Sequence, residues 1–221
     1  MLVLPFVAID RLWSIMSEHP SELEAILGTV GRRERKKEAT RRAIEDTARE
    51  LFSQHGFAKT SVLDITEAVD VSERTFYRYF TSKEDALFGP WRQDLDLALE
   101  LIESRPPSED PLEAMRGVLL AMADHFEDNR ERHFFIAQLA ASSPDVAAYQ
   151  GSVFVPALVE AGAGALARRL GVDTSTDLRP YLFAGVGAAA VNAAMVNWVA
   201  TEGRRPLQDL LMEALDLLPN R

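Results

Sequence analysis

The stretch "SERTFYRYFTSKEDAL", residues 72–87, decides the fold. Ser72 stands where a helix N-cap belongs, and Glu73 follows in the first turn, where the helix dipole favours an anion. Phe76 and Phe80 lie four residues apart and therefore share one helix face. The stretch predicts a short capped helix that is held to its neighbours by aromatic rings.

The opposite face of this short helix carries hydrogen-bond donors. With the phenylalanines turned inward, Arg74, Thr75, Tyr77 and Arg78 are left on the outside. Side chains of these types donate to phosphate oxygens and to base edges. Tyr79 lies at the edge of the inner face, where its ring can pack while its hydroxyl reaches outward. The pattern predicts a surface that reads DNA.

Two further helices are predicted upstream of this segment. An apolar stripe at Ile44, Ala48 and Phe52 indicates a helix over about 36–55, and Gly56 follows as its C-terminal cap. Thr60 or Ser61 then caps a helix over 62–69. Two short helices joined by a tight turn and braced by a longer one form a helix-turn-helix unit, which presents its second short helix to the major groove.

The charge is unevenly distributed along the chain. The total is −10, but residues 32–92 carry 13 Lys/Arg against 11 Asp/Glu, a net +2, whereas residues 1–31 carry −3 and residues 93–221 carry −9. Basic residues begin the positive segment, and Lys37 and Arg41 are candidates for phosphate contacts. A basic run of this kind also occurs at ordinary solvated helix starts.

Residues 52–88, "FSQHGFAKTSVLDITEAVDVSERTFYRYFTSKEDALF", resemble the N-terminal signature of the TetR family of bacterial transcriptional repressors, and the resemblance extends over residues 36–92. It implies backbone contacts to DNA by Thr60, Thr75, Tyr77, Tyr79 and Lys83, and base contacts by Arg74 and Arg78. It also implies a dimer on a palindromic operator and an effector pocket in the remaining helices. The complete predicted DNA-binding set is Lys37, Arg41, Thr60, Ser72, Arg74, Thr75, Tyr77, Arg78, Tyr79 and Lys83.

The rest of the chain is also predicted to be helical, over about 111–128, 132–140, 145–170, 177–201 and 206–218. The last two helices resemble the pair through which such repressors dimerise, so a homodimer through residues about 177–218 is expected. Small residues at spacing four would let a partner helix approach closely, and an apolar stripe on the last helix would match them. These residues are Gly185, Ala189 and Ala193, and Leu207, Leu210, Leu211, Ala214 and Leu218.

The predicted fold class is all-α, with an N-terminal three-helix helix-turn-helix domain (32–92) followed by a larger helical effector-binding and dimerisation domain (93–221). Residues 1–31 are predicted to be an N-terminal extension, a mobile arm with a short helix, or else the true start of the chain is predicted to be Met16. The Gly89-Pro90 pair is expected to break the helix near Phe88 and to act as a hinge between the domains.

The effector is predicted to be small and largely apolar. Aromatic residues with a polar anchor could line its pocket, although ordinary core packing also explains each of them. The candidates are Phe126, Phe135, Phe154, Asn192 and Trp198.

Rival chemistries have weaker support. The chain has no cysteine, and "GVGAAA" at 185–190 lacks the preceding strand of a dinucleotide site. His125, Glu127, Asp128 and His133 could bind a metal if two helices brought them together, but surface polar residues around a helix end explain them better. We therefore predict a cytoplasmic regulator with no catalytic residues, cofactor, metal or membrane span. The alternatives are an activator, a helical enzyme and a helical interaction module.

Overall fold

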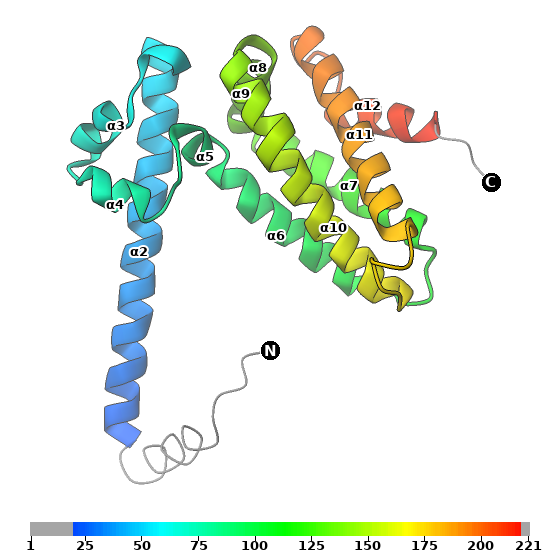
Figure 1. Ribbon diagram of the computed structural model, residues 1–221, viewed down its shortest axis with the longest axis horizontal. Helices are drawn as coiled ribbons and strands as arrows, with labels where there is room; N and C mark the ends of the chain where they lie inside the picture. Colours follow the sequence, from blue (N-terminus) through cyan, green and yellow to red (C-terminus); the bar gives the residue numbers. More distant parts are fainter. Residues whose placement is uncertain (1–19, 218–221) are drawn as a thin grey trace.

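The computed structural model describes the backbone of residues 20–217 and the side chains of residues 33–217. Over these residues the chain is helical, without a strand, which confirms the predicted all-α fold class (Figure 1). The part predicted to bind DNA, called the reader head below, comprises α2 (Pro20–His55), the short turn η1 (Phe57–Lys59), α3 (Val62–Val69), α4 (Glu73–Tyr77) and α5 (Lys83–Leu87). The part predicted to bind an effector, called the effector domain below, comprises α6 (Gly89–Ser104), α7 (Pro111–Asp128), α8 (Arg130–Ser142), α9 (Pro144–Tyr149), η2 (Gln150–Phe154), α10 (Val155–Leu170), α11 (Arg179–Ala200) and α12 (Leu207–Asp216).

Helix α2 is longer than the sequence indicated. The predicted helix began near residue 36, but α2 starts at Pro20 and runs without interruption to His55. Pairs at spacings of three and four support its exposed part, including Lys37 with Glu34 at 3.7 Å and Arg42 with Glu38 at 3.0 Å. The predicted boundary at residue 32 therefore falls inside a helix, and residues 1–19 lie outside the described part.

Serine caps define the helix starts of the reader head, as predicted. Ser61 forms a capping box with Asp64. Ser72 Oγ accepts a hydrogen bond from the Thr75 amide at 3.2 Å, and Ser82 Oγ accepts one from the Asp85 amide at the same distance. Helix α3 ends at Asp70, whose left-handed backbone turns the chain toward α4. Each of these helix starts is therefore determined by a serine and by the residue three positions after it.

Buried apolar side chains hold the reader head together, and α3 and α4 lie together on one side of α2 (Figure 1). Phe76 and Phe80 are buried, with their ring centroids 5.4 Å apart. They belong to one cluster with Ile44 and Phe52 of α2 and Ile65 of α3. The predicted inner face of α4 is thus confirmed.

The predicted break near Phe88 is also confirmed. Phe88 ends α5, and α6 begins at Gly89 with Pro90 in its first turn. Gly89 lies close to α2, and a Cβ at this position would displace the carboxylate of Glu45. The chain therefore changes direction where the reader head meets the effector domain, and the predicted boundary at residue 92 lies just inside α6.

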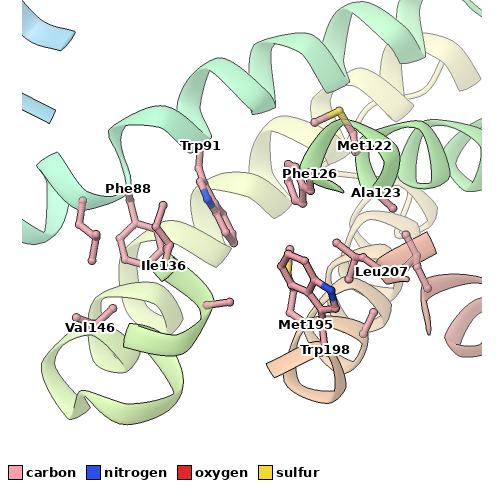
Figure 2. Packing of buried hydrophobic residues seen from close by; sticks show 14 of the residues in the cluster. Phe88, Trp91, Met122, Ala123, Phe126, Ile136, Val146, Met195, Trp198 and Leu207 are labelled. Carbon is pink, nitrogen blue, oxygen red and sulfur yellow. The ribbon is translucent and has the colours of Figure 1, made fainter. Parts of the chain in front are cut away.

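Helices α6–α12 pack around the remainder of the same apolar cluster. Figure 2 shows Trp91 of α6 between Phe88 and Ile136 on one side and Phe126 on the other. Trp91 lies 5.8 Å from Phe88 and 5.7 Å from Phe126 between ring centroids. The start of α6 therefore contacts both the helix break at Phe88 and the interior of the effector domain.

The apolar stripe on the last helix points inward rather than toward a partner. Leu207, Leu210 and Leu211 are buried, and α12 packs against α7 and α11 of its own chain. The expectation that this stripe forms part of a dimer interface was therefore wrong for these leucines. Leu218 lies outside the described residues.

Helix α11 combines a buried face with an exposed apolar face. It is long and apolar enough to cross a membrane by length and composition, and a third of its most apolar window is buried within the chain. It packs against α10, α12, α8 and α7, as a core helix of a bundle does. Ala189, Ala193 and Val196 nevertheless lie exposed, Val196 at 61%.

Candidate DNA-binding face and effector cavity

Helix α4 presents the predicted donors on its outer side. Arg74 and Arg78 are exposed, and Tyr77 is 54% exposed although its neighbour Phe76 is fully buried. Thr75 is half-buried, with its Oγ1 3.0 Å from the capping hydroxyl of Ser72. A short, capped helix thus presents two guanidinium groups and a phenol to the outside.

Tyr79 lies at the edge of this face. The Arg78 guanidinium carbon is 4.9 Å from the centroid of the Tyr79 ring, and Nη2 of Arg78 donates to the Tyr79 hydroxyl at 3.3 Å. This contact is a cation–π arrangement that limits the freedom of the arginine. The two side chains therefore form one donor surface beyond the end of α4.

Thr60 and Lys83 make internal bonds. The buried Thr60 hydroxyl donates to the carbonyl of Gly56 at 3.0 Å. Lys83 Nζ donates to the carbonyls of Phe57 at 2.8 Å and Thr60 at 2.9 Å, and lies 4.4 Å from the centroid of the Phe57 ring. Both residues thus join η1 to its neighbours, and a phosphate contact by Lys83 would use its third N–H.

The basic part of α2 divides into exposed and engaged residues. Lys37 is exposed, whereas Arg41 is half-buried and lies 3.1 Å from Oε1 of Glu45. Glu45 is only 7% exposed, and burial raises the pKa of its carboxyl to about 7 despite the nearby guanidinium. Arg41 therefore compensates a buried carboxyl at the hinge, and Lys37 is the freer of the two candidates for DNA.

Two apolar cavities adjoin each other inside the effector domain, with volumes of about 90 and about 110 Å³. Trp91 and Phe126 line the first, and Ile102 and Gly187 line the second. Side chains from α6, α7, α10 and α11 form the wall that both share: Leu95, Ala98, Leu119, Leu158 and Val191. The pair offers an elongated, almost wholly apolar space.

The structure separates the residues that were predicted to bind the effector. Phe126 and Phe154 both line the first cavity. Asn192 lies in a different groove of about 310 Å³ between α8, η2 and α11, and Phe135 lies in an open cleft between α2 and α8. Trp198 is fully buried, with its ring 4.9 Å from that of Phe134.

Aliphatic residues make up the part of the cavity wall that sequence reasoning missed. Leu95, Ala98 and Leu158 are ordinary core residues by type and spacing, so no sequence signal distinguishes them. The five predicted residues instead follow the general pattern in which aromatic rings with a polar anchor line a ligand site.

A polar cluster stands at the wall of the first cavity. His125 Nε2 lies 2.9 Å from Oδ1 of the buried Asp94, and Arg132 Nη2 lies 3.4 Å from the same oxygen and 3.2 Å from Nε2 of His133. His133 is fully buried and stacks on Phe126 at 4.1 Å. Burial raises the pKa of Asp94 and lowers that of His133 to about 3.

This cluster differs from the metal-binding alternative raised by the sequence. His125 and His133 do come together, with Asp94 as a third potential ligand. Glu127, however, accepts the amide of Leu207 at 2.7 Å at the start of α12. The Arg132 guanidinium already supplies a positive charge between the carboxylate and the imidazole, so a cation would have to displace it.

Comparison with known proteins supports a regulatory role for this architecture. Residues 44–88 match the family model for bacterial regulatory proteins of the tetR family, and residues 109–221 match the model for the MftR C-terminal domain. The HTH-type transcriptional regulator TcmR of Streptomyces glaucescens is 33% identical to this chain over 178 residues, which cover 76% of each protein. The chain belongs to the tetR family of bacterial regulatory proteins.

Two further tetR-family proteins extend the comparison. The transcriptional regulator MftR of Mycobacterium tuberculosis is 31% identical over 173 residues, which cover 78% of this chain and 85% of MftR. A solved TetR-family regulator from Syntrophomonas wolfei has the same fold, with a TM-score of 0.58 and 20% identity, over 81% of this chain and 92% of that one. The prediction of a DNA-binding transcriptional regulator rather than an enzyme is therefore confirmed.

Proposed function

We propose that this tetR-family regulator is a cytoplasmic repressor that binds a palindromic operator as a homodimer and is released by a small, largely apolar effector. The paired cavities carry the effector part of the proposal. They lie between α6, α7, α10 and α11, and their walls are aliphatic and aromatic apart from Asp94. Such a space favours a narrow apolar molecule over a charged or bulky one.

The DNA-binding part assigns separate roles to the reader head. Arg74 and Arg78 would contact base edges, since guanidinium groups pair with guanine in the major groove. Tyr77 and Lys37 would contact phosphates, which fix the position of the head without reading sequence. Their exposure and the rigid cap at Ser72 support these roles.

The dimer would form through the exposed face of α11. Ala189 and Ala193 are small enough for a second helix to approach closely, and Val196 adds apolar surface. The exposed Leu182 extends the same face toward the start of α11. A C2 dimer built on this face would match the two-fold symmetry of a palindromic operator.

A bulky side chain on the wall that the two cavities share should block effector binding without affecting DNA binding. Ala98 lines both cavities, so Ala98→Phe is expected to abolish stabilisation by n-alkanols from hexanol to dodecanol while operator affinity is retained. Wild-type protein should be stabilised by about 2.7 kcal/mol at about a hundred times the alkanol Kd. Thermal unfolding with and without alkanol, together with operator release, measures both properties.

Ala121→Phe is the matched control, because Ala121 is exposed on α7. It should leave the alkanol response unchanged. An undiminished response in Ala98→Phe would place the effector elsewhere, and the groove beside Asn192 would then be the next candidate.

A further inference from the structure

One buried carboxylate of the reader head is shared with the effector domain. Asp85 of α5 is 2% exposed, and its Oδ2 accepts bonds from the Thr81 amide at 2.8 Å and the Thr81 hydroxyl at 3.1 Å. Its Oδ1 accepts from Arg92 Nη2 at 2.5 Å and from the Tyr149 hydroxyl at 3.2 Å. Tyr149, the last residue of α9, is thereby tied to a residue 64 positions away in the chain.

The same tyrosine also packs on the hinge. The Tyr149 ring lies 5.4 Å from that of Phe88, the residue at which α5 ends. Burial and the neighbouring Asp85 carboxylate raise the pKa of Tyr149, so its hydroxyl remains protonated and donates. The contact therefore combines a hydrogen bond to the reader head with aromatic packing at the break before α6.

A π-helical turn, η2, links this contact to the effector cavity. It begins directly after Tyr149 and ends at Phe154. Phe154 lines the first cavity, and its ring lies 5.1 Å from Phe88 and 5.0 Å from Trp91. Phe154, which lines the cavity, thus lies five positions after Tyr149, which bonds the reader head.

This turn can serve as a two-state element. Single π-helical turns are rare and occur often at functional sites. None of the residues Gln150–Phe154 is fully buried, and Gly151 has no side chain to pack, so Phe154 makes the main aromatic contacts of the turn. Conversion to α-helical bonding shifts the register by one residue, which rotates Tyr149 relative to Phe154 by about 100°.

We propose that the Asp85–Tyr149 hydrogen bond is a latch that couples the effector cavity to the orientation of the reader head. The latch is closed while the cavity is unfilled, and a ligand that displaces Phe154 rearranges η2 and opens it. The inference rests on the proposed function, whose effector site it uses. A ligand that binds the open state more tightly than the closed state increases the fraction of molecules in which the latch is open. The size of this shift is set by the ratio of the two affinities.

Tyr149→Phe tests the latch, since it removes the hydroxyl but keeps the ring on Phe88. A hydrogen bond to a charged acceptor is strong enough that its loss should lower the decanol concentration for half-release of operator by about ten-fold. Amide hydrogen exchange in α5 and η2 of the ligand-free protein should accelerate in this variant. Tyr181→Phe is the control, because Tyr181 donates to the carboxylate of Glu160 entirely within the effector domain.

The outcomes separate the latch from the proposed function. If decanol releases wild-type protein and Tyr149→Phe matches Tyr181→Phe in half-release concentration, the latch is wrong and the apolar effector stands. If decanol does not release wild-type protein from the operator, the proposed effector class is wrong. Amide hydrogen exchange in the ligand-free protein then tests the latch by itself. Faster exchange confined to α5 and η2 of Tyr149→Phe supports it, and exchange equal to that of Tyr181→Phe overturns it.

Discussion

Phe76→Ala is expected to cost about 3–5 kcal/mol of the free energy of unfolding, because it removes a fully buried ring from a core that cannot close around the gap. Phe76 is the residue through which α4 packs on Phe80 and on the interior of the reader head. DNA binding should be lost together with the stability of the head. Urea unfolding monitored by circular dichroism, with operator binding below the transition, measures both effects.

Tyr77→Ala, at the neighbouring position, is expected to reduce operator affinity without reducing stability. Tyr77 is 54% exposed, so its removal should change stability by no more than about 0.5 kcal/mol while operator affinity falls. Equal losses of stability in the two variants would mean that α4 is not oriented as described, with one ring inward and the next outward.

Ala193→Glu should have the second large effect. Ala193 is exposed at the middle of the apolar face of α11, and a carboxylate buried at a two-fold interface would face its own copy. The proposed dimer is expected to dissociate, and operator affinity to fall by about 100-fold or more as the two heads lose their linkage. Sedimentation velocity and operator titration test the two statements separately.

Ala121→Glu on the exposed side of α7 controls for the added charge. This variant should remain dimeric and retain operator affinity. A fully dimeric Ala193→Glu protein would exclude this face of α11 as the interface.

Local signals explain why so much of the reader head could be predicted. The caps at Ser61, Ser72 and Ser82 act on amides within three residues, so each can be recognised from a short stretch of sequence. The break at Pro90 is local in the same way, because proline lacks the amide that a continuous helix requires. The length of α2 was underestimated because glycines at 28 and 31 weaken the helical signal before the basic run.

Long-range packing explains what could not be predicted. The periodicity of Leu207 and Leu211 identifies an apolar face, but it does not indicate whether that face meets its own chain or a partner. Phe126 and Trp198 are alike by residue type, yet only Phe126 reaches the cavity, because the helices that converge there are set by tertiary contacts. The contact between Asp85 and Tyr149 leaves no trace in local sequence for the same reason.

The most direct test of the account is the binding of wild-type protein to the DNA upstream of its own gene, measured by fluorescence anisotropy as salt is raised. A head that makes about six to ten phosphate contacts should lose about 10³–10⁵ in affinity between about 50 and 200 mM salt. Binding should also exceed that to a scrambled fragment of the same length. Binding that is insensitive to salt, or equal on both fragments, would contradict the proposal that α4 reads an operator.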